Sequence, residues 1–326
     1  MDGNMKVSMK MIDPELRFCG RLMNFVNRTF TEKKLSLFNK LLRKHPPKIK
    51  VKKITFEKVW IPRKDGSKMR ICIFKPITTK GNVPGMLWFH GGGYAIGAPE
   101  QAQMRAQDFI EKRNCIVIAP EYRLSIQAPY PAALEDCYDA LVWMKNNAEK
   151  LGIKNNQLMV GGESAGGGLA AALCHYARDK GEIKIAFQMP LYPMIDDRMT
   201  NESAMNNNAP VWNSKSNYNG WKLYLGPLFE MSNVPAYAAP ARSENYENLP
   251  PLATFVGGLE PFRDETINYV ENLKKAGVPV DFKIFKGCFH GFDVICPKAK
   301  ISQEAISFTL KSFEFAVDNY FSQQDH

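Results

Sequence analysis

Residues 158–169 read LMVGGESAGGGL, and this stretch decides the fold class. The apolar run predicts a strand, and the small residues after Ser164 predict a helix. Between them lies the pentapeptide Gly162-Glu163-Ser164-Ala165-Gly166, which has the pattern G-x-S-x-G. In a strand-turn-helix of this kind the serine sits at the tip of a tight turn, and the glycines let strand and helix approach closely. The stretch therefore predicts an α/β protein with Ser164 as its nucleophile.

The rest of the chain alternates short apolar runs with helical stretches. Strands are predicted at 86–89, 115–119, 157–161, 184–189, 252–256 and 280–285, and helices near 99–113, 131–150, 164–180, 261–276 and 302–321. Such near-continuous apolar strands, alternating with helices, are typical of a mainly parallel sheet covered on both faces.

The N-terminal part and one internal segment depart from this alternation. Two amphipathic helices are predicted at 14–30 and 31–45, and a hairpin at 51–76 turns at Asp65-Gly66. Residues 196–242 are polar, rich in Asn and too long for an ordinary loop. The expected organisation is a catalytic domain, 49–326, with a helical cap built from residues 1–48 and 196–242. The apolar face expected for the second helix consists of Leu35, Leu37, Phe38, Leu41 and Leu42.

Composition excludes several classes of protein. The chain has 326 residues, of which 45% are hydrophobic and 23% charged, so it is neither disordered nor a small disulfide-stapled domain. No apolar run has the roughly 18 residues of a membrane span, and the N-terminus lacks the apolar stretch of a signal peptide. We therefore expect a cytoplasmic protein. The seven cysteines are scattered and form no C-x-x-C pair, which predicts neither a disulfide framework nor a zinc site.

The net charge of +10 is concentrated near the N-terminus. Residues 1–80 hold 21 Lys and Arg against 6 Asp and Glu, and the remaining residues hold 22 against 27. A basic region of this kind can bind nucleic acid or a membrane surface. Here the charges alternate with apolar residues in amphipathic segments, so we interpret them as solvated faces and expect no nucleic-acid partner.

A second glycine motif, His90-Gly91-Gly92-Gly93, follows the strand predicted at 86–89. Consecutive glycines after a strand can turn backbone N–H groups toward one point, as an oxyanion formed in acyl transfer requires. The expected donors are the N–H groups of Gly92, Gly93 and Ala165.

Five histidines could supply the base that a serine nucleophile needs. His175 follows Ser164 by 11 residues on one predicted helix, which places it about 16 Å away. His290 lies just beyond the last predicted strand, where an α/β-hydrolase carries its histidine. The remaining three lie in the glycine motif or at segment ends: His45, His90 and His326. By elimination, His290 is the predicted base.

A serine nucleophile and its histidine base need a third group, a carboxylate that orients the histidine. This carboxylate should lie between Ser164 and His290 in the chain. The strand predicted at 252–256 is followed by Glu260, Asp264 and Glu265. The last two fall in the first turn of a predicted helix, where negative charge also favours the helix dipole. Glu260 lies in the loop and is the preferred acid, with Asp264 in reserve.

Taken together, these motifs resemble the hormone-sensitive-lipase-like family of α/β-hydrolases, a group that includes bacterial carboxylesterases and acetyl esterases. The resemblance rests on HGGGY (90–94), EYRL (121–124), YPAALEDC (130–137), GESAGG (162–167), YPMIDDR (192–198), EPFRDE (260–265) and HGF (290–292). It implies a mostly parallel eight-stranded sheet, a helical cap, and neither a metal nor an organic cofactor.

The chain departs from the family pattern at three places. Glu163 and Glu260 stand where the family commonly has Asp, and the longer side chain at position 260 must be absorbed by the placement of the backbone or of the histidine. Residues 125–127, Ser-Ile-Gln, replace the usual Ala-Pro-Glu. This last change touches no proposed catalytic group.

The predicted function is that of a serine carboxylesterase acting on small-molecule esters. The resemblance implies short-chain acyl substrates, and Tyr94, Tyr192 and Trp212 are candidate pocket walls. Two alternatives remain: a dedicated deacetylase of acetylated sugars or another natural ester, and a non-catalytic binding protein on the same fold. A homodimer is left open, and no insertion into a membrane is expected.

Overall fold

Eight strands form one sheet in the order β1-β2-β4-β3-β5-β6-β7-β8. The computed structural model describes residues 6–26, 32–44, 48–49, 51, 53–78 and 81–324. β1 and β2 are antiparallel to their neighbours, whereas β3 to β8 run parallel to one another. The strands are β1 (Ile54–Pro62), β2 (Lys68–Pro76), β3 (Val83–Phe89), β4 (Ile116–Pro120), β5 (Ile153–Glu163), β6 (Phe187–Leu191), β7 (Leu252–Gly257) and β8 (Val280–Phe285).

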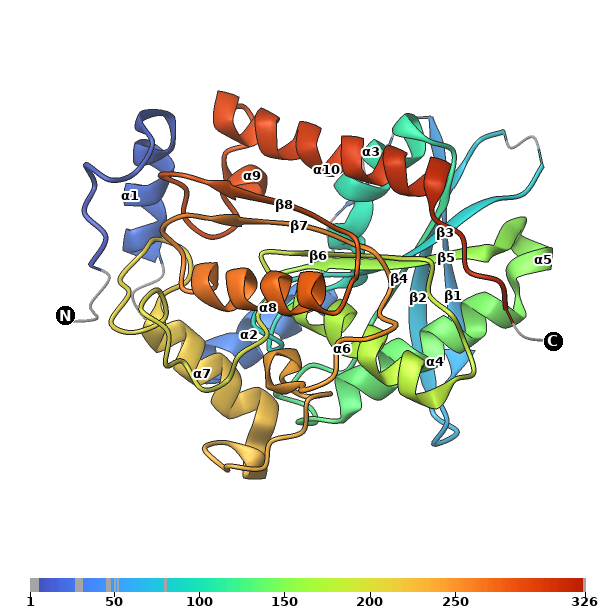
Figure 1. The fold of residues 1–326 in the computed structure, drawn as a ribbon, viewed down its shortest axis with the longest axis horizontal. Coiled ribbons are helices and arrows are strands. Elements are labelled where there is room, and N and C mark those ends of the chain that lie inside the picture. The colour runs from blue at the N-terminus through green and yellow to red at the C-terminus, as the bar shows by residue number, and fades with distance from the viewer. Residues whose placement is uncertain are drawn as a thin grey trace.

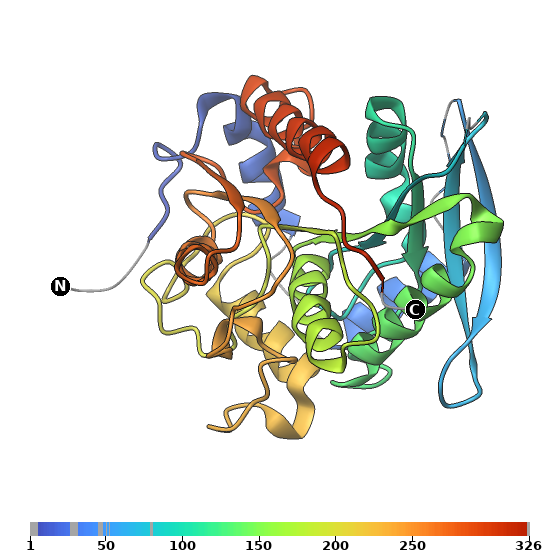
Figure 2. The ribbon, with the colours of Figure 1, turned by 45° about the vertical axis from the view of Figure 1, so that its right-hand side comes forward.

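Helices cover both faces of this sheet (Figures 1 and 2). α3 (Gln103–Lys112) and α10 (Lys300–Asn319) pack together on one face, and α4 (Ala132–Asn146), α6 (Ala165–Lys180) and α8 (Arg263–Lys275) lie on the other. The shorter elements are α5 (Ala148–Leu151), α9 (Phe292–Ile295), η1 (Pro14–Leu16), η2 (Pro99–Ala102), η3 (Gly226–Leu228) and η4 (Pro240–Arg242). The prediction of a mostly parallel eight-stranded sheet with helices on both faces is confirmed.

Three local predictions differ from the structure. β6 begins at Phe187, three residues later than expected. Two helices were not predicted, α9 and α7 (Ser214–Leu225), and α7 lies within the polar segment 196–242. Asn213 caps α7 by accepting a hydrogen bond from the N–H of Ser216, and Trp221 and Tyr224 bury its inner face. This packing stabilises a helix whose Asn- and Ser-rich sequence gives it low intrinsic propensity.

The N-terminal helices and α7 lie at the end of the molecule to which the carboxyl ends of the parallel strands point (Figure 1). α1 (Arg17–Val26) places Gly20 against Phe289, next to His290. α2 (Glu32–Lys44) contacts the loop after the glycine motif, because Asn39 donates a hydrogen bond of 2.7 Å to the Ala95 carbonyl. These contacts put both helices beside the loops that follow β3 and β8. The division into a cap and a catalytic domain remains a prediction.

The predicted apolar face of α2 was wrong in detail. Leu35 is buried, but Leu37 and Leu41 are exposed. The inward face is defined instead by Leu35 and Asn39, whose amide reaches the loop beneath it. Leu42, seven residues after Leu35, is half-buried, and the side chain of Phe38 lies outside the described residues.

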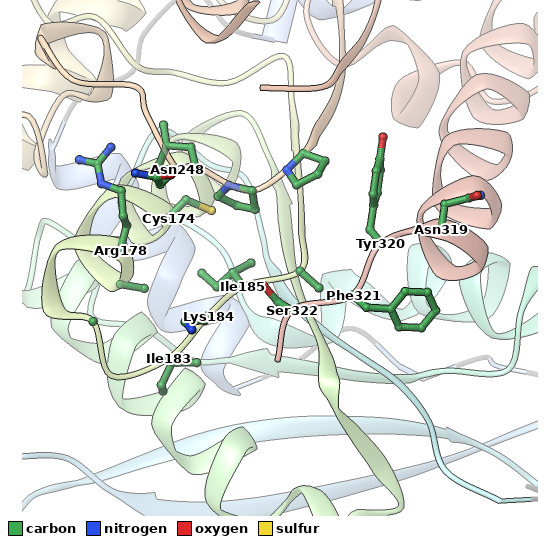
Figure 3. Close-up of a pocket in the computed structure, with 16 residues that line it drawn as sticks. Cys174, Arg178, Ile183, Lys184, Ile185, Asn248, Asn319, Tyr320, Phe321 and Ser322 are labelled. Carbon is green, nitrogen blue, oxygen red and sulfur yellow. The ribbon is translucent and has the colours of Figure 1, made fainter. Parts of the chain in front are cut away.

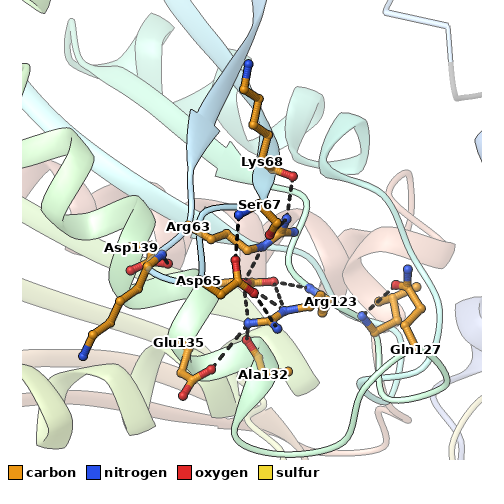
Figure 4. A network of polar contacts seen from close by, with 12 residues as sticks. Arg63, Asp65, Ser67, Lys68, Arg123, Gln127, Ala132, Glu135 and Asp139 are labelled. Carbon is orange, nitrogen blue, oxygen red and sulfur yellow. Dashed lines mark hydrogen bonds and ion pairs between the residues drawn. The ribbon is translucent and has the colours of Figure 1, made fainter.

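Part of the N-terminal basic excess is used in ion pairs. Arg63, in the β1–β2 turn, and Arg123, which follows β4, belong to one polar network (Figure 4). Both donate to the buried carboxylate of Asp136 on α4. Arg70 on β2 joins Glu100 and Glu121. These contacts tie the antiparallel edge of the sheet to its helical layer. No helix in the described part of the chain is both long and apolar enough to cross a membrane.

Candidate active site

Ser164 occupies the sharp turn between β5 and α6, as the G-x-S-x-G pattern predicts. Its backbone has φ 58° and ψ −119°, a conformation that L residues rarely adopt and that costs about 1–3 kcal/mol. Neighbouring backbone groups hold it: the Ser164 N–H donates to the Leu191 carbonyl at 3.0 Å, and the Ser164 carbonyl accepts from Met194 N–H at 3.1 Å. The strained turn keeps the side chain clear of the helix, and 6% of the residue remains exposed.

Gly166 lets this turn pack directly on the end of β3. A Cβ at position 166 would overlap the Phe89 carbonyl oxygen and would lie 2.5 Å from the His90 carbonyl oxygen. Both obstacles are backbone atoms, so a side-chain rotation cannot relieve them. The absence of a Cβ therefore brings the nucleophile turn against the segment that starts the glycine motif.

Ser164, His290 and Glu260 form one continuous chain of polar contacts. His290 Nε2 lies 2.8 Å from Ser164 Oγ, and His290 Nδ1 makes a short contact with Glu260 Oε2. A carboxylate can only accept, so the imidazole carries its proton on Nδ1 and leaves Nε2 free to accept from the serine hydroxyl. His290 is 5% exposed and Glu260 is fully buried. The structure thus brings together the three residues that the sequence singled out.

A backbone contact fixes the orientation of the Glu260 carboxylate. Its Oε1 atom accepts a hydrogen bond of 2.6 Å from the N–H of Gly257, at the end of β7. Oε2 is consequently the oxygen that faces His290. The turn at the end of β7 therefore holds the Glu260 side chain in place.

Asp264, the reserve candidate for the acid, points elsewhere. Its carboxylate accepts from the Ser203 N–H at 2.8 Å and pairs with Arg263. Although partial burial opposes ionisation, Arg263 and Ser203 hold the pKa of Asp264 below its ordinary value. Asp264 therefore anchors residue 203 of the inserted segment.

Aromatic rings enclose His290 on several sides. Tyr192 and Phe262 meet the imidazole edge to face, with ring centroids 5.1 and 5.0 Å away, and Trp212 lies at 6.4 Å. Trp212 also covers Gly93, since a Cβ there would lie 3.0 Å from its Cζ3 atom. The rings limit the access of water to the imidazole, and their faces favour a nearby cation. Tyr94 instead stacks on Tyr224 at 3.8 Å and is a buried packing residue.

The glycine motif lies directly against the nucleophile turn. A Cβ at Gly91 would be 3.0 Å from the Glu163 carbonyl oxygen and 3.4 Å from Ser164 Cβ. Gly92 and Gly93 have φ angles of 127° and 58°, which favour glycine. Among the hydrogen bonds of the described residues, none uses the N–H of Gly92, Gly93 or Ala165. These N–H groups are therefore available to an oxyanion.

The other described histidines have structural environments. His90 stacks on Tyr122, and its Nδ1 lies 2.8 Å from the Gly91 carbonyl; burial lowers its pKa to about 4. His175 contacts the Tyr269 hydroxyl through Nε2 at 3.0 Å, and burial lowers its pKa to about 3. The two remaining histidines lie outside the described residues: His45 and His326.

Sequence reasoning missed several residues that support the site. Phe262 lies against His290, Tyr122 supports His90, and Asn39 fixes the loop after the glycines. Tyr122 and Phe262 lie within the EYRL and EPFRDE motifs, which were a usable signal. Asn39 lies on an N-terminal helix with no motif of its own.

A cavity of about 620 Å³ lies at the far end of α6 from Ser164 (Figure 3). It is formed where α6 ends, before β6 and β7 begin, and where α10 ends; Cys174, Arg178, Pro250 and Tyr320 are among its lining residues. Cys174, the lining residue on α6 that is nearest to Ser164 in the chain, follows it by 10 residues, or about 15 Å along the helix. The guanidinium of Arg178 already donates hydrogen bonds to the backbone carbonyls of Asn245 and Glu247. The cavity is remote from the candidate site.

The described residues offer no cluster of three or more His, Cys, Asp or Glu side chains arranged to hold a metal ion. All seven cysteines are free, and all but Cys19 are buried. Burial raises the pKa of Cys72 to about 12, which makes its thiol unreactive.

Comparison with known proteins agrees with this geometry. The sequence model of a family described as alpha/beta hydrolase fold matches residues 86–294. The chain is 35% identical over 214 residues to Esterase LipI of Mycobacterium tuberculosis, covering 65% of this chain and 67% of that protein. It is 29% identical over 296 residues to an arylesterase of Saccharolobus solfataricus, covering 86% and 92%. A solved structure titled Bacterial Heroin Esterase superposes with a TM-score of 0.86 and 32% identity, covering 95% of this chain and 99% of that one.

Proposed function

This chain belongs to the alpha/beta hydrolase family, in its hormone-sensitive-lipase-like group, and is a carboxylic ester hydrolase. We propose that it cleaves short-chain acyl esters through Ser164, His290 and Glu260. The observation that carries this proposal is the continuous chain of contacts from Ser164 Oγ through both nitrogens of His290 to Glu260. Such a chain supplies a nucleophile, a base and a group that orients the base.

In the first step, Ser164 Oγ attacks the ester carbonyl carbon while His290 Nε2 takes the hydroxyl proton. The carbonyl oxygen becomes an oxyanion, and we assign its stabilisation to the N–H groups of Gly92, Gly93 and Ala165. Losing one such donor costs about 3–4 kcal/mol in comparable sites. The tetrahedral intermediate collapses when the protonated His290 gives its proton to the alcohol oxygen, which leaves.

In the second step, His290 takes a proton from water, and the resulting hydroxide attacks the acyl-enzyme carbonyl. Collapse releases the carboxylic acid and returns the proton to Ser164 Oγ. Glu260 has two roles in both steps: it keeps the proton of the neutral imidazole on Nδ1, and it stabilises the imidazolium. The backbone N–H of Gly257 supports these roles, because it fixes which carboxylate oxygen faces the ring.

The proposed preference for short acyl chains rests on the enclosure of the site. Trp212 covers Gly93, and α1 and α2 contact the loops beside the catalytic residues. We infer that residues 1–48 and 196–242 act as a cap that limits the acyl length. Replacing Trp212 with Ala should extend the range of substrates toward longer chains.

We further propose that the enzyme acts in the cytoplasm and requires no cofactor, since serine acyl transfer needs only the groups named above. The free, buried cysteines are compatible with a reducing compartment. A homodimer remains a proposal that sedimentation can test.

The test is hydrolysis of p-nitrophenyl esters from acetate to laurate, with Ser164→Ala as the control. The proposal predicts rapid turnover of the short esters, a steep decline with chain length, and background rates for Ser164→Ala. Turnover of acetylated glycans together with poor turnover of all p-nitrophenyl esters would favour a dedicated deacetylase. A folded wild type that is no faster than Ser164→Ala on any ester would favour a binding protein.

A further inference from the structure

Three charged side chains that the proposed mechanism does not use lie next to the catalytic residues. Glu163 immediately precedes Ser164, and Asp293 follows His290 by three residues on α9. Arg105 comes from α3 and lies between the two carboxylates. Asp293 and Arg105 are buried, and Glu163 is largely so.

Arg105 makes a separate contact with each carboxylate. Its Nε donates to Glu163 Oε1 at 2.7 Å, and its Nη2 donates to Asp293 Oδ2 in a short contact. One guanidinium thus joins the segment that carries the nucleophile to the segment that carries the base. Two atoms of one rigid, planar group set the spacing between these segments.

We propose that Arg105 is a positioning residue that keeps the Ser164 turn and the His290 loop at the distance that proton transfer requires. The inference rests on the proposed function, because it concerns the distance between Ser164 Oγ and His290 Nε2, 2.8 Å in this structure. A shift of about 1 Å between reacting groups can lower a rate about 100-fold. The bridge acts only through Glu163 and Asp293, since Arg105 itself does not contact Ser164 or His290 in any hydrogen bond of the described residues.

The surroundings keep the guanidinium charged. Burial opposes its charge, but Asp293 and Glu163 outweigh this and hold the pKa of Arg105 well above its ordinary value. The hydroxyl of Tyr192 also faces the cluster, and Asp108 lies near Arg105. The guanidinium therefore stays charged at every pH at which the enzyme can be assayed, whereas burial raises the pKa of Glu163 above its ordinary value.

The chain offers a closely matched control in Arg70. Its Nε donates to Glu121 Oε2 at 2.9 Å, and its Nη1 makes a short contact with Glu100. Arg70, like Arg105, joins one fully buried carboxylate to one that is partly exposed. It lies on β2 and touches none of the catalytic residues. Lys58 also pairs with Glu100, at 3.0 Å, so this carboxylate keeps a partner when Arg70 is changed. A change at Arg70 therefore disturbs a bridge of the same kind without changing the distance between Ser164 and His290.

The experiment compares Arg105→Lys with Arg70→Lys, because Lys keeps the charge but cannot bridge two carboxylates with a rigid fork. For each variant, the melting temperature is measured, the active sites are titrated with a p-nitrophenyl phosphonate, and kcat and KM are determined on p-nitrophenyl butyrate. The expected result is a fall in melting temperature for both variants, smaller for Arg70→Lys because Lys58 also pairs with Glu100. Only Arg105→Lys should lose kcat per titrated site, by about 10- to 100-fold, with KM within about twofold of wild type.

A second readout tests the coupling. Glu163→Asp shortens one arm of the same bridge, so the double variant Arg105→Lys, Glu163→Asp should lose little more kcat than the worse of the two single variants. If Arg105→Lys does not fold, the neutral triple variant Arg105→Met, Glu163→Gln, Asp293→Asn takes its place, with the same expected loss of kcat.

A kcat per site within twofold of wild type in Arg105→Lys, or in the triple variant if Arg105→Lys does not fold, would overturn the proposal while leaving the proposed function intact. Additive losses in the double variant would also overturn it. An inert wild type that the phosphonate does not label would instead overturn the proposed function, and this proposal with it.

Discussion

Replacing Glu260 with Gln should lower kcat by about 10⁴-fold while leaving the fold intact. The change conserves size and removes one negative charge from a buried site. Its effect can be worked out from the contacts on either side of the carboxylate. Oε1 accepts from the Gly257 N–H at 2.6 Å, and Oε2 faces His290 Nδ1.

A glutamine at this position has only one productive orientation. Its amide oxygen must face the Gly257 N–H, because an NH₂ group there would oppose another donor. The NH₂ group then faces His290 Nδ1, which has to become an acceptor. The imidazole proton moves to Nε2, where it points at Ser164 Oγ and prevents Nε2 from taking the hydroxyl proton.

The magnitude follows from this wrong tautomer together with the lost stabilisation of the imidazolium. Neutralising the acid of a serine triad lowers kcat by about 10⁴-fold. Each factor of ten in rate corresponds to about 1.36 kcal/mol, so this loss corresponds to about 5.4 kcal/mol of transition-state stabilisation. KM should change little, because Glu260 is buried behind His290 and does not face the substrate.

The assay is the steady-state hydrolysis of p-nitrophenyl butyrate, with Asp264→Asn as the matched control. Asp264 lies four residues away but contacts Ser203 and Arg263, so its variant should keep kcat within about tenfold of wild type. Circular dichroism checks the fold of both. A Glu260→Gln variant within tenfold of wild type, or an Asp264→Asn variant that is the more damaged of the two, would refute the reasoning.

Three further results are expected. Gly166→Ala places a methyl group against the Phe89 and His90 carbonyl oxygens, so it should lower the free energy of unfolding by about 2–3 kcal/mol or prevent folding; a thermal midpoint unchanged from wild type would contradict this. Burial lowers the pKa of His175 to about 3, so the unfolded chain binds this proton first and stability falls as pH drops below the ordinary histidine value. Between pH 7 and pH 5, the free energy of unfolding of His175→Gln, measured with urea, should therefore fall by about 2 kcal/mol less than that of wild type. Equal falls in the two proteins would contradict this expectation. Only Cys19 among the seven cysteines is not buried, so a disulfide reagent should label one thiol in the native enzyme and all seven after unfolding; rapid labelling of more native thiols would show that the packing is looser than described.

The positions of Ser164, His290 and Glu260 at one edge of the sheet could be predicted because they follow from chain order. A serine between a strand and a helix, and a histidine after a late strand, must lie at the carboxyl edge of a parallel sheet. Glu260 was preferable to Asp264 on the same ground, since a loop residue at the end of β7 faces this edge. The contact with Gly257 that orients its carboxylate could not be predicted, because it depends on the three-dimensional course of the turn.

Other features depend on contacts between distant parts of the chain. Arg105 is separated from Glu163 by 58 residues and from Asp293 by 188, and in the sequence it is an unremarkable charge on an amphipathic helix. α7 has a composition typical of loops and exists because Trp221 and Tyr224 pack against Tyr94. Local propensity carries no information about either arrangement.

The central claim, that Ser164 is the nucleophile, is tested most directly by covalent labelling. The enzyme is incubated with a p-nitrophenyl alkylphosphonate, digested, and analysed by mass spectrometry. One phosphonyl group per chain is predicted on the peptide that contains Ser164, with activity lost in proportion to labelling and no adduct in Ser164→Ala. An adduct on another residue that accounts for the inactivation, or full inactivation with Ser164 unmodified, would contradict the account.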